Sequence, residues 1–364
     1  MSTFTQIQFP GLTDSNFNHE IVQTPKLIPG DGQIVIKNKA VAINPLDAKR
    51  LIYGIRIESW PTGGGFEVAG VVDSIGDGVT DLEIGDEVMA VAGPSELSTY
   101  GFQEYSRIQA GGAVRKPKNL SFEEAASLPY VSFHSSASRI TLTFVSCRIV
   151  TVTATGVLSF GLGTPFPFFP QGGAAVSGIR TVLVLGGASA VGAQAIQLLH
   201  HYSPEITILA TSSPQNFDLV KSLGARYVFN YRDADVIEQI RKGAPEGVNA
   251  VVDFVGSLVQ DTQFYKLFEG TQQPKILATL ATGPPITKEG LPEDVEVRED
   301  LGLVNVIMKG GVTSTLQAMA DAVDNGEFKL PVPVNVLGKG FDKIIEGLKI
   351  SFKGASAQKL VVSL

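Results

Sequence analysis

A short glycine-containing turn is the segment of this sequence best suited to bind a charged ligand. The apolar run TVLVLGG is followed directly by the helical pattern ASAVGAQAIQLL. Gly186 and Gly187 allow a tight turn, and Gly192 lets a helix begin close to the strand. Residues 189–191 can then point backbone N–H groups at a pyrophosphate, which a helix N-terminus also attracts. The turn predicts a dinucleotide site, although Ser189 replaces the central glycine of G-x-G-x-x-G and a plain strand-to-helix turn is the alternative.

The end of the next apolar run, ITILATSS, indicates which dinucleotide would bind. An NAD site usually has an acidic side chain there to hold the ribose hydroxyls, whereas this sequence has Thr211, Ser212 and Ser213. Hydroxyl groups and the amide of Asn216 could donate to a 2′-phosphate, and two cations, Lys221 and Arg232, lie close in the sequence. Because no carboxylate stands there to repel that phosphate, these residues favour NADPH. They also suit the N-cap of the following helix, and both roles can hold together.

Two patterns of secondary structure surround these residues. From Thr181 onward, apolar strand-like runs alternate with helical patterns, which predicts a doubly wound parallel sheet because parallel neighbours need crossover helices. Residues 33–108 show short β-rich runs separated by turn residues, typical of a mostly antiparallel barrel or sandwich. A capping box of Ser121 and Glu124 begins a helix where the two patterns meet. A helix over 313–325 precedes β-type sequence that we expect to rejoin the first domain.

The composition of the chain excludes several classes of partner. Lys and Arg total 29 and Asp and Glu total 36, so the net charge of −7 argues against nucleic acid and anionic lipid. The single cysteine, Cys147, excludes a disulfide framework and a multi-cysteine metal site. The first residues lack the pattern of a secretory signal, and Gly and Pro interrupt the one long uncharged stretch, residues 149–179. We therefore expect a cytoplasmic protein without a membrane span.

Several separated segments together resemble the medium-chain dehydrogenase/reductase superfamily. They are the glycine turn, TSSPQNFDLVKSLGA, AVAINPLDAK, GGGFEVAGVVDSIGDGV and EGLKISFKGASAQKLVV. Within the superfamily the chain is similar to zinc-independent quinone oxidoreductases and enoyl reductases, especially fungal trans-acting enoyl reductases and fungal proteins labelled zinc-binding dehydrogenases. The resemblance implies an α/β protein in which a Rossmann domain, residues 126–312, is inserted in a chaperonin-10-like barrel domain, residues 1–125 and 313–364.

The resemblance also implies which residues contact the cofactor NADPH. They form a phosphate loop, a 2′-phosphate pocket and a segment beside the nicotinamide. The phosphate loop falls on Ala188, Ser189, Ala190 and Val191, the pocket on Ser213, Asn216 and Tyr231, and the nicotinamide segment on Asn44, Pro45, Leu46 and Asp47.

Two zinc ligands of the superfamily's alcohol dehydrogenases are missing. Asn44 stands where those enzymes have a cysteine ligand, and Phe66 replaces the histidine of their Gly-His-Glu sequence. Catalytic zinc needs about three N or S ligands, and this chain has one Cys and four His, of which His200 and His201 are adjacent on a predicted helix. We therefore expect no metal.

Lys49 and His134 are the candidate catalytic residues. Lys49 follows the nicotinamide segment, where a cation could orient the ribose, polarise a carbonyl or protonate an enolate; a surface lysine on a turn is the alternative. His134 stands where the superfamily's LP-x-x-x-x-Thr segment, here beginning at Leu128, usually has threonine. Its imidazole could donate a proton or anchor a ligand, or it could be an ordinary helix-surface or core histidine.

Residues 140–159 depart from the superfamily pattern. Their Thr and Val content suits strands, while their position in a helix-rich stretch suits a helix. Relatives usually run from the helix after LP directly into a Pro-rich linker, so this block resembles an insertion near the substrate cleft. One hypothesis is that it is a translated intron.

The residues and the resemblance together predict hydride transfer from NADPH to the β-carbon of an α,β-unsaturated carbonyl. The small-molecule substrate would be an enone, a polyketide intermediate or a quinone, and a polyketide synthase is a candidate partner. Two alternatives stay open: a zinc-independent alcohol or carbonyl dehydrogenase on the same scaffold, and a non-catalytic NADPH-binding subunit that assists a synthase. The sequence fits either a monomer or a homodimer.

Overall fold

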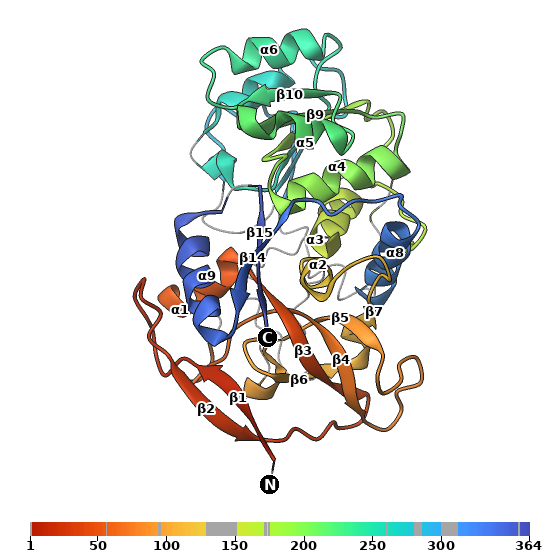
Figure 1. Ribbon diagram of the computed structural model, residues 1–364. Coiled ribbons are helices and arrows are strands. Elements are labelled where there is room, and N and C mark those ends of the chain that lie inside the picture. Colours follow the sequence, from red (N-terminus) through yellow and green to blue (C-terminus); the bar gives the residue numbers. More distant parts are fainter. Residues whose placement is uncertain are drawn as a thin grey trace. The chain divides into compact units, whose positions relative to one another are not determined.

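A computed structural model shows two compact units, which we call the barrel unit and the Rossmann unit (Figure 1). The barrel unit comprises Met1–Ile140 and Val312–Leu364, and the Rossmann unit comprises Thr141–Gly311. The structure describes residues 2–55, 57–93, 96–128, 151–170, 173, 175–259, 261–279, 286–299, 312–355 and 357–364.

The barrel unit is built on a mostly antiparallel sheet in the order β14-β15-β3-β4-β5-β7, with β6 paired to β3. A separate two-stranded ribbon pairs β1 with β2. The strands are β1 (Thr3–Gln8), β2 (Glu20–Pro25), β3 (Gln33–Ile43), β4 (Glu67–Ile75), β5 (Glu87–Val91), β6 (Tyr105–Gln109), β7 (Ala113–Arg115), β14 (Val334–Lys339) and β15 (Lys359–Ser363). The helices are α1 (Pro45–Tyr53), α2 (Phe122–Ala126), α8 (Val312–Asp324) and α9 (Phe341–Lys353).

Strand β3 is the central element of this unit. It pairs antiparallel with β4 on one side and with the C-terminal strand β15 on the other, so the last residues of the chain belong to the same sheet as residues 33–43. Alternate side chains of these strands fill an apolar core that includes Ile34, Ile36, Val41 and Leu360. This pairing places the end of β3, where α1 begins, between two neighbouring strands.

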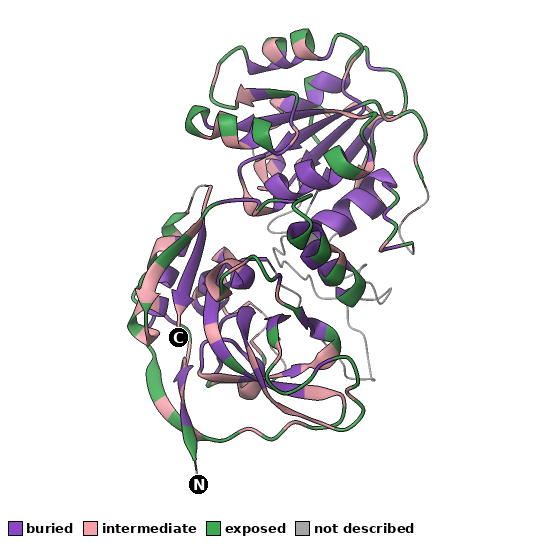
Figure 2. Ribbon diagram, turned by 45° about the vertical axis from the view of Figure 1, so that its right-hand side comes forward, coloured by how far each residue is buried: buried purple, intermediate pink, exposed green. Residues whose placement is uncertain are grey.

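The Rossmann unit contains a parallel sheet in the order β10-β9-β8-β11-β12-β13. Its strands are β8 (Thr181–Leu185), β9 (Thr207–Ser212), β10 (Tyr227–Asn230), β11 (Ala250–Asp253), β12 (Ile276–Thr279) and β13 (Glu296–Arg298), and its helices are α3 (Thr151–Gly156), α4 (Ala190–Tyr202), α5 (Phe217–Ser222) and α6 (Val236–Gly243). The strands are largely buried, as the purple ribbons in Figure 2 show. The predicted fold class, a doubly wound sheet combined with a mostly antiparallel barrel, is confirmed.

The strand order reverses between β8 and β11. Open parallel sheets bind ligands at the carboxyl ends of the strands next to such a switch point. The glycine turn follows β8 directly, so the fold places it where a dinucleotide site is expected.

Helix α9 was not predicted from the sequence. A glycine and several β-branched and aromatic residues lower the helical propensity of this segment, but burial of Ile344, Ile345 and Leu348 favours the helix. Gly347 lies at the contact with the sheet, where a Cβ would lie 2.1 Å from the Cδ1 of Ile43, so a larger residue would require that side chain to move. Tertiary packing therefore overrides local preference.

Only part of the unusual block 140–159 lies within the described residues. From Thr151 it forms α3 and a π-helical turn, Val157–Gly161, and α3 packs against α4. This part of the block belongs to the packed Rossmann unit, and residues 140–150 lie outside the described residues. In the part of the chain that the structure describes, no helix is both long and apolar enough to cross a membrane.

Candidate active site

The glycine turn after β8 is closely packed on both sides. Gly186 has a φ of +77°, and a Cβ there would lie 2.3 Å from Val255. A Cβ on Gly192 would lie 2.3 Å from the carbonyl oxygen of Gly186. Glycine is therefore needed at both positions, one for the left-handed turn and one for the close start of α4.

Hydrogen bonds fix this turn to the neighbouring strand β9. The N–H of Gly187 donates to the carbonyl of Thr211 at 2.8 Å, and the N–H of Gly186 donates to the hydroxyl of Thr211 at 3.2 Å. Ser189 is the N-cap of α4, and its hydroxyl accepts from the N–H of Gly192 at 3.1 Å. Of the predicted phosphate-loop residues, Ala188 and Val191 are buried, while Ser189 and Ala190 are partly accessible. The cradle fits a pyrophosphate at the N-terminus of a helix.

A second polar group forms where β9 and β10 end side by side. The two strands are parallel, and Asn230 pairs with Ser212. This register brings the residues that follow, Ser213, Tyr231 and Arg232, into contact. Arg232 Nη1 donates to the hydroxyl of Ser213 at 3.3 Å, and the hydroxyls of Ser213 and Tyr231 are 3.4 Å apart.

The guanidinium of Arg232 also stacks over the ring of Tyr231, 4.7 Å from its centroid. The nearby carboxylate of Asp233 accepts from the side-chain amides of Asn230 and Gln239. Asn216, predicted with this group, is half-buried, and its N–H donates to the carbonyl of Ser213 at 3.0 Å. The group offers two hydroxyls and a planar cation, the donors suited to a phosphate.

A buried cluster of charged residues surrounds the start of α1 in the barrel unit. The side chain of Asn44 donates to Glu67 Oε2 at 2.8 Å and accepts from the ammonium of Lys359 at 2.6 Å. Glu67 and Lys359 also form an ion pair, and their side chains are 0% and 6% exposed. Asp47 accepts from the N–H groups of Asn44 and Gly65 at 2.8 and 2.9 Å. These contacts tie three strands and a helix together through Asn44.

The two carboxylates of this cluster have raised pKa values. Burial raises the pKa of Asp47 to about 6, against the opposing effects of two backbone N–H donors and Arg50. Burial raises the pKa of Glu67 to about 7, while Lys359 lowers it. Desolvation exceeds the stabilisation of the charged form in both cases. Glu67 and Lys359 lie far apart in the sequence, and no local pattern indicates that they belong to one site.

The predicted nicotinamide segment adopts the first turn of α1. Pro45 occupies the start of the helix, while Asn44, Leu46 and Asp47 are buried. Lys49 lies on the same helix and is half-buried. The helix therefore carries the predicted cofactor segment and one candidate catalytic residue, and its start is held by the charged cluster.

His134, the other candidate catalytic residue, lies outside the described residues. The described chain resumes at α3, whose Thr153 is completely buried. If residues 134–152 were absent, Thr153 would be the fifth residue after Pro129. That is the threonine position of the LP-x-x-x-x-Thr segment, a reading that the sequence analysis missed because it placed the start of the atypical block at residue 140.

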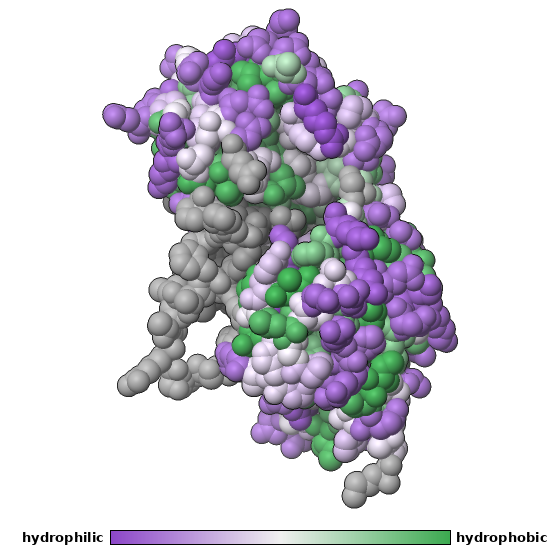
Figure 3. Space-filling model, turned by 90° about the vertical axis from the view of Figure 1, so that its left-hand side faces the viewer, coloured by the Kyte–Doolittle hydropathy of each residue, from purple (hydrophilic) through white to green (hydrophobic). Residues whose placement is uncertain are grey.

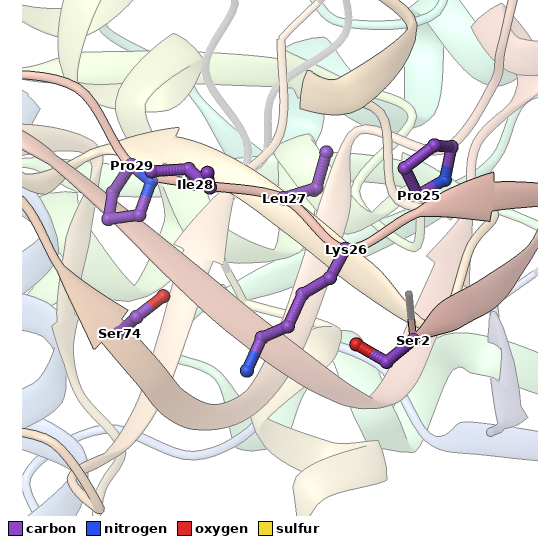
Figure 4. Close-up of a pocket in the computed structure, with 7 residues that line it drawn as sticks. All are labelled: Ser2, Pro25, Lys26, Leu27, Ile28, Pro29 and Ser74. Carbon is purple, nitrogen blue, oxygen red and sulfur yellow. The ribbon is translucent and has the colours of Figure 1, made fainter.

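A surface pocket on the barrel unit does not include any predicted site residue. It has a volume of about 480 Å³ and is lined mainly by residues 25–29 with Ser2 and Ser74 (Figure 4). On the face drawn in Figure 3, hydrophobic side chains of the described residues are interspersed with hydrophilic ones. The predicted site residues that the structure describes lie in the glycine turn, in the group around Arg232 and at the start of α1.

Comparisons with known proteins agree with this fold. Two family models match the chain, "Alcohol dehydrogenase GroES-like domain" over residues 30–118 and "Zinc-binding dehydrogenase" over residues 190–267. A zinc-type alcohol dehydrogenase-like protein of Schizosaccharomyces pombe is 33% identical over 268 residues, which cover 73% of this chain and 70% of that protein. The chain belongs to the medium-chain dehydrogenase/reductase superfamily. It is an oxidoreductase of this superfamily, whose members bind nicotinamide coenzymes, and the resemblance in its sequence is confirmed.

Other relatives and solved structures match over most of the chain. Dehydrogenase orsE of Emericella nidulans is 28% identical over 359 residues, which cover 97% of this chain and 98% of that protein. Trans-enoyl reductase fsa3 of a Fusarium species is 33% identical over 269 residues, 71% of this chain and 66% of that protein. The CurK enoyl reductase structure has a TM-score of 0.74 at 21% identity and covers 100% of this chain and 99% of its own. The structural likeness shows a shared fold.

The residues present do not fit the zinc that one family description names. The amide of Asn44 is already bound by Glu67 and Lys359, and Phe66 packs its ring 5.9 Å from that of Tyr100. Neither side chain supplies a nitrogen or sulfur ligand of the kind that zinc prefers. Among the described residues, no group of three or more His, Cys, Asp or Glu side chains could hold a metal ion.

Proposed function

We propose that the protein is an NADPH-dependent reductase of activated C=C bonds. The choice of NADPH as the coenzyme rests on the contacts among Ser213, Tyr231 and Arg232 at the ends of β9 and β10. An arginine and hydroxyls at this position suit the 2′-phosphate of NADPH, whereas an acidic residue would suit the ribose of NAD. The predicted role of Asn216 in the same pocket is part of the proposal.

The phosphate loop supplies the second part of coenzyme binding. The first N–H groups of α4 have no earlier helical carbonyl to bind, and the hydroxyl of Ser189 already satisfies Gly192. The N–H groups of Ala190 and Val191 are therefore the donors we assign to the pyrophosphate, with Ala188 and Ser189 shaping the turn.

The barrel unit would supply the groups that act near the reacting carbons. Bound NADPH would provide the hydride. Asn44, Pro45, Leu46 and Asp47 would border the nicotinamide, and Lys49 would stabilise the enolate oxygen or return a proton after hydride transfer. An ammonium group suits both tasks because it is a cation with three donors.

The substrate class follows from the relatives' names and stays part of the proposal. Three relatives are named trans-enoyl reductases, fsa3, himH and eqxC, and we propose an enoyl or enone substrate of polyketide type, with a quinone as a further acceptor. A polyketide synthase would then be the source of the substrate. Because orsE and azaJ are named dehydrogenases, zinc-independent carbonyl or alcohol oxidoreduction is the second candidate.

The test compares coenzymes, substrates and one pair of variants. NADPH oxidation is measured with an enone, a quinone and a saturated aldehyde, and the proposal predicts that NADPH is consumed with the first two.

Arg232→Ala should weaken NADPH binding by about tenfold or more, since a charge-assisted hydrogen bond contributes about 1.5–3 kcal/mol. The same variant should leave NADH binding unchanged.

The matched control is Arg226→Ala, because Arg226 is an exposed arginine beside the other end of β10 that stacks on Tyr227. It should leave both affinities unchanged. Equal loss of NADPH binding in both variants would contradict the coenzyme assignment, and turnover of the aldehyde alone would favour the second candidate.

A further inference from the structure

We infer that Lys359 is a positioning residue, which together with Glu67 fixes the orientation of the Asn44 amide beside the bound coenzyme. The inference rests on the proposed function, because that function places Asn44 at the nicotinamide. It assigns a role to two residues from distant parts of the chain that the sequence pattern did not connect.

The strand pairing explains why these three residues meet. Ile43, the last residue of β3, pairs with Leu360 of β15, so Lys359 lies next to Asn44. On the other side of β3, Ala42 pairs with Glu67 of β4. The residue that follows β3 is thus flanked by a cation on one neighbouring strand and a carboxylate on the other.

The chemistry of these neighbours permits one orientation of the amide. A lysine ammonium can only donate hydrogen bonds, and Glu67 Oε2, which faces both that ammonium and Asn44 Nδ2, accepts from both. Asn44 Oδ1 must therefore face Lys359, and Asn44 Nδ2 must face Glu67, as the distances of 2.6 and 2.8 Å show. A rotated amide would place the Nδ2 donor against the ammonium of Lys359 and the Oδ1 acceptor against the carboxyl oxygen of Glu67. The pair therefore fixes the positions of the second N–H of Nδ2 and the second lone pair of Oδ1, which are the amide's remaining hydrogen-bonding groups.

Stability alone does not account for this buried pair. Removing two charges from water is costly, and apolar residues of similar volume often stabilise a protein as well or better. The side chains of Lys359 and Glu67 are almost completely buried, and Glu67 Oε1 has no hydrogen-bond partner among the described residues. One carboxylate oxygen of the pair thus lacks a hydrogen-bond partner in the described part of the chain, whereas both side chains of the pair bind Asn44. This arrangement suits the orientation of Asn44 better than it suits the stability of the fold.

The experiment isolates Lys359 in a background without the buried negative charge. Lys359→Met alone would leave Glu67 unpaired and destabilise the protein. The informative comparison is therefore Glu67→Gln against the double variant Glu67→Gln with Lys359→Met. In Glu67→Gln the new amide oxygen can still accept from Asn44 Nδ2, and Lys359 still binds Asn44 Oδ1.

The proposal predicts different kinetics for two folded proteins. Compared with Glu67→Gln, the double variant should lose about tenfold or more in kcat, the effect of a lost bond to a charged group. The NADPH Kd should be the same in both variants, because the phosphate-binding residues belong to the Rossmann unit. Equal kcat values in the two variants would overturn the inference.

A second readout separates this inference from the proposed reductase function. Hydrogen exchange of the segment spanning residues 40–53 is followed by mass spectrometry in both variants. The proposal predicts faster exchange at the start of α1 in the double variant only, with the Rossmann strands unchanged. If the wild-type protein reduces no enone or quinone, the proposed function fails, and unchanged exchange in the double variant would overturn the positioning role independently.

Discussion

Replacing Glu67 with glutamine should change how the stability of the barrel unit depends on pH. Burial raises the pKa of Glu67 from 4.5 to about 7, so the folded state binds a proton more tightly than the unfolded state does. The stabilisation from this proton is complete below pH 4.5 and is lost as the pH rises through 7. The wild-type protein should therefore become less stable from pH 5 to pH 8.

The size of the effect follows from the shift in pKa. A difference of 7 − 4.5 = 2.5 between the two states, at about 1.36 kcal/mol per unit, corresponds to about 3 kcal/mol in total. Most of this falls between pH 5 and pH 8. Asp47, whose pKa is about 6, adds a similar trend in both proteins, so the difference between wild type and Glu67→Gln should grow as the pH rises through 7.

Fluorescence of Trp60 provides the assay. It is the only tryptophan of the sequence and packs against the barrel core, so urea unfolding followed by its emission reports on the barrel unit. The free energy of unfolding is measured at several pH values for the wild type, Glu67→Gln and Glu83→Gln, an exposed control. The control should follow the wild type. Parallel curves for wild type and Glu67→Gln, or a wild type more stable at pH 8 than at pH 5, would refute the reasoning.

Two further predictions concern Lys49 and the atypical block. Lys49→Ala should lower kcat by about 100-fold or more, which is the contribution of a general acid, and should leave the NADPH affinity unchanged. The control is Lys39→Ala, because Lys39 is a half-buried lysine of β3. Equal kcat values in the two variants would exclude catalysis by Lys49. The position of Thr153 shifts the hypothesis of a translated intron from residues 140–159 to residues 134–152, which include His134. Transcript sequencing should then find a message without the codons for residues 134–152, in whose product Thr153 is the fifth residue after Pro129. A message population that always retains those codons would end the intron hypothesis.

The features that sequence analysis predicted correctly depend on local patterns. The apolar run of β8, the glycines after it and the helical spacing of α4 are contiguous, so they could be interpreted together. The capping box at Ser121 is equally local, and the structure confirms it: the Ser121 hydroxyl accepts from the N–H of Glu124.

The features that it missed depend on contacts between distant segments. Lys359 and Asn44 meet only because β15 pairs with β3, and no spacing rule connects residues so far apart in the chain. Arg232 was noted as a nearby cation, but its contact with Ser213 requires the register between β9 and β10. Helix α9 depends on burial against the barrel core, which its own residues do not reveal.

The central claim is that the glycine turn and the group around Arg232 bind NADPH. Isothermal titration of the purified wild-type protein with NADPH and with NADH tests it most directly. We expect one NADPH bound per chain, with an affinity at least about tenfold higher than that for NADH, as a charge-assisted contact with the 2′-phosphate requires. Equal affinities for the two coenzymes, or no heat with either, would contradict it.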